Sequence, residues 1–209
     1  TRVLEVGQQK NNIRLFVVDK EVNGLQRDSL NMVDGRGGAR LKLNDVVISR
    51  KDILGEIHKG TQPLEQILDS ANAAIAAEML GIGLEVFERT LSYLKERKQF
   101  GVAIGSFQSL KHRCALMLCE IELTKSVVLE SMSALDENRS DCSELCSVAK
   151  VKACDMLELV TNEGVQMHGG IGMTDDHDIG LFLKRGRVAA QLFGDAIYHR
   201  SRYCELRGL

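Results

Sequence analysis

The sequence has one proline and no tryptophan among its 209 residues, and aromatic residues make up only 4% of it. So little proline argues against an all-β protein with many turns and against a disordered linker chain. Charge of one sign is not in excess either, because 27 basic residues face 29 acidic ones and the formal net charge is −2. This balance gives no reason to expect a nucleic acid as a partner. The composition therefore favours a mainly helical globular protein.

Long hydrophobic segments and sorting signals are also missing. No run approaches the ~18 consecutive apolar residues of a membrane helix, so we expect no membrane insertion. No charged segment followed by an apolar one opens the chain, so no secretory signal is expected. The six cysteines lie in helix-like stretches without a Cys-x-x-Cys pair, which predicts free thiols in a reducing compartment and no metal site.

The first 50 residues carry the signals of β-strands. Ile13–Val18 is rich in β-branched and aromatic residues, and the turn-forming run Glu21–Gly24 follows it. Arg40–Leu43 alternates, Val46–Ile48 resumes after a break, and Asp34–Gly38 is a turn-rich interruption. We predict three or four antiparallel strands, which are too few for a whole β domain. Residues 1–58 are therefore interpreted as a partial antiparallel β domain.

From Thr61 onward the apolar residues recur at helical spacing. One long helix is predicted from Thr61 to about Lys98, and a second after Ser106, whose hydroxyl would cap it. A third is predicted to end near His168, followed by a shorter one over about Asp178–Leu192 and another from about Asp195. Long helices with short connections predict an antiparallel four-helix bundle over residues 59–209.

Three short segments at the helix junctions stand out together. Glu96–Gly101 reads ERKQFG and closes the first long helix, and Ser106–Arg113 reads SFQSLKHR and opens the second. Gly164–Thr174 reads GVQMHGGIGMT and closes the third. In this order they resemble the C-terminal helical domain of the acyl-CoA dehydrogenase family. The strands before Thr61 are similar to the later part of that family's central β domain.

The resemblance implies that two segments contact FAD held by a neighbouring subunit. Arg97 and Phe100 would touch the cofactor, and Gln108 would donate a hydrogen bond to its oxygens. From the residues alone, the favoured interpretation of Arg97 is a solvated cation at a helix end, and Gln108, in a first helical turn, could merely cap the helix.

The third segment has the same two interpretations. Gln166, Gly169 and Gly170 read alone as the end of a helix. The resemblance implies that the two glycines let the backbone approach the adenine dinucleotide half of FAD and that Gln166 supplies a hydrogen bond. His168 is open to plain packing or to cofactor contact.

Other polar residues of this half are interpreted as structural. We expect His177 and His199 at the surface. The cations Lys184, Arg185 and Arg187 are expected on a solvated helix face.

The family reaction is the α,β-dehydrogenation of an acyl-CoA thioester, in which a glutamate removes the α proton while FAD accepts the hydride. Such a base needs a buried carboxylate. Alignment with the two places where the family holds it gives Gly194, with Ala196 at a usual flavin-contacting threonine, and Ala71. The nearest carboxylate is Asp195, which is also a good helix N-cap. Glu78 lies two turns beyond Ala71 and is a weaker candidate.

The missing base favours one function over two others. The stretch Phe193–Arg200 resembles the smaller, base-poor subunits of bacterial hetero-oligomeric acyl-CoA dehydrogenases. We therefore expect a subunit or fragment that helps to bind FAD and acyl-CoA in a homo- or hetero-oligomer. The alternatives are a self-sufficient dehydrogenase that uses Asp195 as its base and a helical assembly scaffold without cofactor. The resemblance implies the bacterial cytoplasm, or else the mitochondrial matrix.

Family chains are longer than this one. They begin with another helical domain and the first half of the β domain, neither of which is matched here. The resemblance therefore implies that a single copy of these 209 residues does not form a complete active site.

Overall fold

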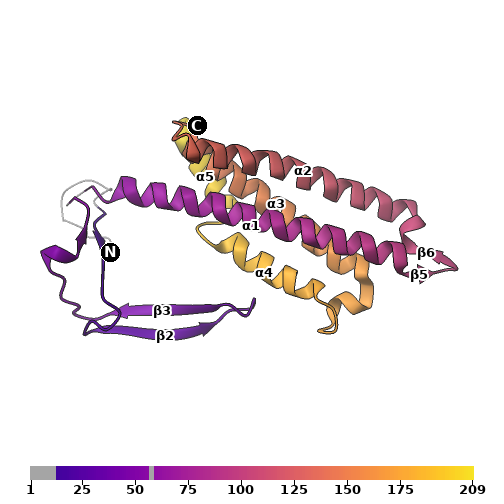
Figure 1. Cartoon of the computed structure of the whole chain (residues 1–209), viewed down its shortest axis with the longest axis horizontal. Coiled ribbons are helices and arrows are strands. Elements are labelled where there is room, and N and C mark those ends of the chain that lie inside the picture. The colour runs from indigo at the N-terminus through magenta and orange to yellow at the C-terminus, as the bar shows by residue number, and fades with distance from the viewer. Residues whose placement is uncertain (1–12, 57–58) are drawn as a thin grey trace. The chain divides into compact units, whose positions relative to one another are not determined.

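The computed structural model describes residues 13–56 and 59–209. The chain folds as two compact units, one extending to Leu68 and the other from Asp69 to Leu209. The first unit is built from short strands and the second from long helices (Figure 1). The predicted class, mainly α with a small antiparallel β portion, is confirmed.

The described residues of the first unit form two antiparallel strand pairs. Strand β1 (Leu15–Phe16) pairs with β4 (Ile53–Leu54), and β2 (Leu25–Asn31) pairs with β3 (Gly37–Leu43). The expected strand at Val46–Ile48 was wrong, because the structure has no regular element there.

Gly24 and Asn44 meet at the open end of the β2–β3 hairpin, opposite its turn. The Asn44 N–H donates to the Gly24 carbonyl at 2.9 Å. A Cβ on Gly24, whose φ is +89°, would lie 2.0 Å from the Asn44 carbonyl oxygen, so no other residue fits. Strand β2 was not predicted, because its residues are mostly polar and exposed and show no alternation of apolar and polar side chains.

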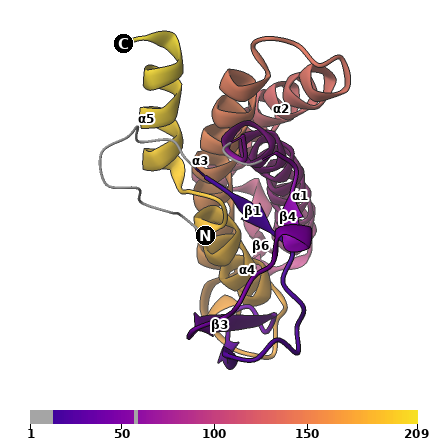
Figure 2. The same ribbon diagram turned by 90° about the vertical axis from the view of Figure 1, so that its left-hand side faces the viewer.

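The second unit is a bundle of antiparallel helices. Helices α1 (Thr61–Glu96), α2 (Gln108–Asp136) and α3 (Cys142–His168) are long, and α4 (Ile179–Gln191) and α5 (Ala196–Arg207) are shorter. Helix α3 contacts α2, α4 and α5. Figure 2 looks along the bundle and shows α5 standing beside α3. The predicted four-helix bundle is thus confirmed, with α5 added to it.

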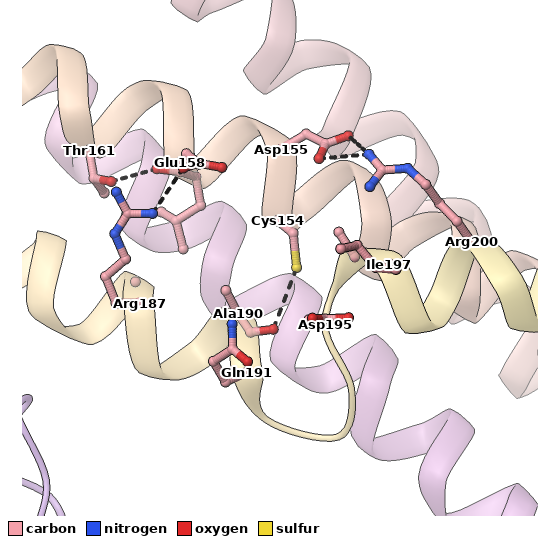
Figure 3. A pocket seen from close by; sticks show the side chains of 13 residues that line it. Cys154, Asp155, Glu158, Thr161, Arg187, Ala190, Gln191, Asp195, Ile197 and Arg200 are labelled. Carbon is pink, nitrogen blue, oxygen red and sulfur yellow. Dashed lines mark hydrogen bonds and ion pairs between the residues drawn. The ribbon is translucent and has the colours of Figure 1, made fainter.

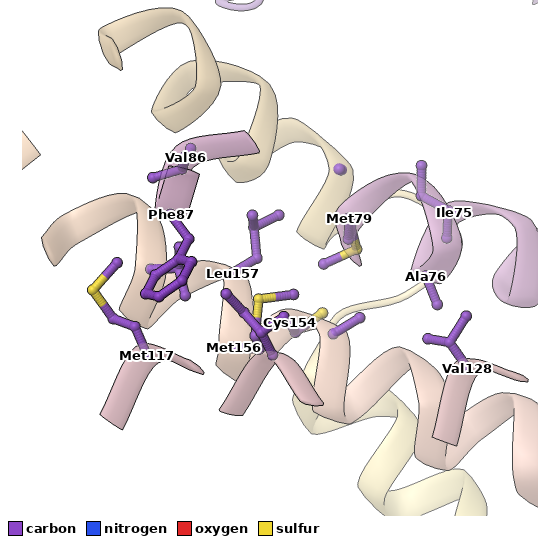
Figure 4. Packing of buried hydrophobic residues seen from close by; sticks show 14 of the residues in the cluster. Ile75, Ala76, Met79, Val86, Phe87, Met117, Val128, Cys154, Met156 and Leu157 are labelled. Carbon is purple, nitrogen blue, oxygen red and sulfur yellow. The ribbon is translucent and has the colours of Figure 1, made fainter. Parts of the chain in front are cut away.

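The core lies where α1, α2 and α3 face each other (Figure 4). Met79 and Val86 of α1, Met117 of α2 and Met156 of α3 are fully buried. A Cβ on Gly83 of α1 would lie 2.5 Å from the Met156 sulfur, so this glycine sets how closely α1 approaches α3. Burial of the predicted apolar face is therefore what orders these helices.

Helix α1 differs from the expectation in two respects. It ends at Glu96, because the next residues enter a short hairpin. By length and composition it also meets the criteria for a membrane-spanning helix, which the core helix of a helical bundle meets as well. The expected absence of membrane insertion stays a prediction.

Candidate functional site

One end of the bundle collects the residues that the resemblance assigned to the cofactor. Helix α1 ends, α2 begins and α3 ends there, because the three helices run antiparallel in sequence order (Figure 1). The Tyr93 hydroxyl of α1 donates to the His168 carbonyl of α3 at 3.2 Å and fastens two of these ends together. The three motifs, distant in sequence, therefore share one surface.

Arg97 and Phe100 lie in the hairpin of β5 (Lys98–Gln99) and β6 (Val102–Ala103) that follows α1. The Ile104 N–H donates to the Arg97 carbonyl at 2.8 Å and closes this hairpin. Phe100 has a φ of +54°, a strained value for an aromatic residue, and its side chain is 89% exposed. Its ring meets Phe107 edge-on at 6.1 Å. A strained, solvent-exposed aromatic ring is suited to contact with a group outside the chain.

Gln108 is the first residue of α2, which begins without a side-chain cap. The predicted cap by Ser106 was wrong, because its hydroxyl donates to the Ala103 carbonyl at 2.7 Å instead. Backbone N–H groups at an uncapped helix start carry partial positive charge, and the exposed Arg97 and Lys111 add full charges at this end. This combination is suited to an anion such as a phosphate.

Gln166 and the two glycines form the end of α3. Gln166 is exposed, and Gly169 ends the helix with a φ of +65°, which favours glycine. A Cβ on Gly169 or Gly170 would meet nothing within 4 Å, so the backbone is open to a close approach from outside the chain. All six predicted cofactor residues thus lie at one end of the bundle.

His168 lies inside the bundle at this end. Its side chain is 2% exposed, and its ring stacks on Tyr93 with centroids 4.5 Å apart. Its Nδ1 donates to the Gly164 carbonyl at 2.7 Å, and burial lowers the pKa of the imidazole. Tyr93 also lines a cavity of about 350 Å³, together with His177 and other residues of the last turns of α1. The geometry therefore gives His168 the packing role.

Asp195 lies away from this end, in the connection between α4 and α5. Helix α4 runs back from the cofactor end, and its 13 residues at ~1.5 Å each separate the two places by about 20 Å. Its carboxylate Oδ1 accepts the Tyr198 N–H at 2.8 Å, which makes Asp195 the N-cap of α5. The structure thus keeps Asp195 apart from Arg97 and its neighbours within one chain.

A cavity of about 340 Å³ lies beside Asp195, between α3, α4 and α5 (Figure 3). Its charged side chains are paired: Arg200 binds Asp155 at 2.6 Å, and Arg187 binds Glu158 at 3.0 Å. This cavity therefore offers no unpaired charge to a ligand apart from Asp195 itself.

Two buried residues lie behind the α4–α5 connection, of which the sequence analysis missed Lys150 and misplaced His199. Lys150 of α3 is fully buried, and burial lowers the pKa of its ammonium group. His199 of α5 is also fully buried, so its expected place at the surface was wrong. Its Nε2 donates to the Phe193 carbonyl at 3.1 Å, and burial lowers its pKa. The spacing of Lys150 four residues after the buried Cys146 and four before Cys154 was the one available signal.

Arg185 also departs from the expectation. Its side chain is 13% exposed and pairs with Glu78 of α1, at 2.7 Å from Nε to Oε1 and 2.8 Å from Nη2 to Oε2. Both oxygens of Glu78 are thereby occupied, which leaves no lone carboxylate to act as a base. Lys184 and Arg187 are exposed, as expected.

The described residues hold no group of three or more His, Cys, Asp or Glu side chains that could bind a metal ion. All six cysteines lie in the described part of the chain, and they are free thiols, as predicted.

Comparison with known proteins shows which family the chain belongs to. The family model described as "Acyl-CoA dehydrogenase, C-terminal domain" matches residues 58–203. The chain belongs to the acyl-CoA dehydrogenase family. Members of this family are oxidoreductases that depend in general on FAD, bind acyl-CoA and form oligomers.

Three similar proteins illustrate the match. Acyl-CoA dehydrogenase IpdE2 of Mycolicibacterium smegmatis is 39% identical over 128 residues, 61% of this chain and 39% of that protein. The probable acyl-CoA dehydrogenase YngJ of Bacillus subtilis is 32% identical over 183 residues, 86% of this chain and 48% of that protein. A solved variant of the "Tcur3481-Tcur3483 steroid ACAD" is 28% identical, with a TM-score of 0.83 over 93% of this chain and 52% of that chain. The present chain thus spans about half the length of such relatives or less.

Proposed function

We propose that the chain is part of a subunit of an FAD-dependent acyl-CoA dehydrogenase that contributes contacts to FAD across a subunit interface and carries no catalytic base. The observation behind this is the gathering of Arg97, Phe100, Gln108, Gln166 and the Gly169-Gly170 pair on one exposed end of the bundle.

The residues at that end fit the chemistry of FAD. Arg97 offers a fixed cation to the pyrophosphate, and the uncapped start of α2 adds N–H donors beside it. Phe100 presents an aromatic ring, and Gly169 and Gly170 leave the backbone accessible. When bound, FAD supplies the hydride acceptor for the oxidation of the acyl group. The side chains of this end contact it, orient it and balance its charge.

The contacts of Asp195 and Glu78, the two candidate carboxylates, support the proposal that this subunit lacks the base. One oxygen of Asp195 accepts the Tyr198 N–H, so this carboxylate already serves as the N-cap of α5. Glu78 is engaged by Arg185 through both oxygens. The alternative in which Asp195 removes the α proton is therefore less well supported than a base in another subunit.

The partner is then a related acyl-CoA dehydrogenase subunit that carries the glutamate, in a hetero-oligomer that binds acyl-CoA. The similarity to a solved protein whose name joins two designations, Tcur3481-Tcur3483, agrees with this proposal. We place the complex in the bacterial cytoplasm, with the mitochondrial matrix as the alternative.

The test is Arg97→Ala in the full-length protein assembled with its partner, with FAD affinity measured by titration of the flavin-free complex. Loss of a charge-assisted hydrogen bond of roughly 1.5–3 kcal/mol predicts about ten- to a hundredfold weaker binding. Arg207→Ala is the matched control, because Arg207 is an exposed arginine that pairs with Glu144 at the start of α3, at the opposite end of the bundle. Unchanged FAD affinity in Arg97→Ala would refute the proposal.

A further inference from the structure

The connection between α4 and α5 has an unusual backbone. Phe193 has a φ of +59° and Gly194 a φ of +105°, so two consecutive residues lie in the left-handed region. Phe193 is not a glycine, and its backbone is therefore strained unless the surrounding contacts fix it. A Cβ on Gly194 would lie 2.4 Å from the Tyr198 ring, so the chain passes tightly over the start of α5.

Lys150 holds this connection from inside the bundle. Its Nζ carries three N–H donors and lies within hydrogen-bond distance of four carbonyl oxygens, those of Leu192 and Gly194 at 2.9 Å each and those of Ala190 and Ala189 at 3.1 and 3.2 Å. Ala189 and Ala190 belong to the last turn of α4, where carbonyls have no partner within the helix and the helix dipole is negative. A single ammonium group thus fixes both where α4 ends and how the chain turns after it.

His199 completes the arrangement from the other side. Its Nε2 donates to the Phe193 carbonyl, the one carbonyl between those of Leu192 and Gly194 that Lys150 leaves free. Three successive carbonyls of a strained connection therefore bind two fully buried side chains from α3 and α5. Buried lysine is rare because removing its charge from water is costly. The carbonyl contacts of Lys150 must therefore offset this desolvation cost.

We propose that Lys150 and His199 are positioning residues that fix the α4–α5 connection, and with it the Phe193 side chain and the Asp195 cap of α5, for the substrate of the assembled enzyme. The inference rests on the proposed function, because it takes this connection to face the acyl-CoA site. Asp195 and Ala196 line the cavity of about 340 Å³ beside it. Phe193 is 47% exposed and so presents part of its ring outside the chain. A shift of this connection would move both side chains together.

The experiment compares Lys150→Met with Lys152→Met in the full-length complex. Met keeps the apolar stem of lysine and removes the donors. Lys152 is the matched control, because it lies on the same helix and pairs with Glu120 of α2 at 2.7 Å, away from the connection. Three quantities are measured for each variant: FAD content, hydrogen exchange of the Tyr198 amide, and flavin reduction by acyl-CoA as a function of its concentration.

We expect Lys150→Met to retain FAD, because the cofactor contacts lie at the far end of α4. The Tyr198 amide should exchange faster, since Asp195 no longer caps α5 in a fixed position. The rate at saturating acyl-CoA should fall by about 100-fold, the order of effect that a displacement of ~1 Å has on a positioned site. A fall in this rate, with FAD retained, distinguishes positioning from a general loss of fold.

If Lys150→Met does not fold, the pair His199→Gln and His199→Leu tests the same inference. Glutamine keeps an N–H donor for the Phe193 carbonyl and should restore most of the rate, whereas leucine should not. Rates within about twofold of wild type in Lys150→Met or His199→Leu would overturn the inference. So would an unchanged exchange rate of the Tyr198 amide. Absence of FAD from the wild-type complex would instead refute the proposed function. In that case hydrogen exchange of the Tyr198 amide would still test whether Lys150 fixes the α4–α5 connection.

Discussion

Asp69 is a buried carboxylate, and removing its counterion is expected to lower the free energy of unfolding by a large and measurable amount. It is 4% exposed, and its Oδ1 lies 2.7 Å from Nη1 of Arg202, whose side chain is 16% exposed. Its Oδ2 accepts the Ser143 hydroxyl at 2.5 Å, and Arg202 also donates to the Ser147 hydroxyl at 2.9 Å. This network connects α1, α3 and α5 in one place.

The perturbation is Arg202→Met, which retains most of the apolar stem and removes the charge. It leaves Asp69 buried without a counterion, which costs about 3–5 kcal/mol of the free energy of unfolding. For a protein of this size that loss lowers the unfolding temperature by roughly 6–20 °C. The assay is thermal unfolding followed by far-UV circular dichroism at one fixed protein concentration.

Two further variants decide whether the reasoning is correct. Arg207→Met removes a more exposed arginine of the same helix, which pairs with Glu144, and should cost no more than about 1 kcal/mol. Adding Asp69→Asn to Arg202→Met removes the stranded charge, keeps an acceptor for Ser143, and should recover most of the lost stability. The reasoning fails if Arg202→Met behaves like Arg207→Met, or if the double variant is no more stable than Arg202→Met alone.

Two other predictions concern protonation. Burial holds the pKa of His168 and of His199 below the usual 6.5, so below about pH 6.5 the unfolded chain binds more protons than the folded one and stability must fall as the pH falls. Unfolding temperatures from about pH 7.5 to about pH 5 should show this decline, and His199→Gln should reduce its slope. Asp195→Asn keeps an N-cap for α5, so the flavin reduction rate of the complex should stay near normal. A fall of several orders of magnitude with FAD retained would instead make Asp195 the base.

The features predicted from the sequence are those set by local pattern. The helical spacing of apolar residues gave the bundle, since such a face is stable only when it is buried against another helix. Asp195 was recognised as a candidate cap because an aspartate after a glycine and before an apolar run is a local signal. The ERKQFG, SFQSLKHR and GVQMHGGIGMT segments were assigned to helix junctions for the same reason, and the junctions are where they lie.

Other features depend on partners that are distant in sequence. Strand β2 has no apolar alternation and exists through its pairing with β3. Ser106 was expected to cap α2, but its hydroxyl donates to the Ala103 carbonyl in the preceding turn. Arg185 was expected in solvent, yet Glu78 lies 107 residues before it in the chain and meets it across two helices.

The sequence by itself determined the helices, their order and the residue types that meet at one end of the bundle, because hydrophobic periodicity and helix-end chemistry act over a few neighbouring residues. Only the tertiary structure decided which groups surround Lys150 and His199. Burying a lysine on a helix face is unfavourable unless acceptors surround its ammonium group. For Lys150 the acceptors are four carbonyls of a chain segment some 40 residues later. Its partners exist only in the folded protein, since they are backbone groups whose positions no side-chain pattern encodes.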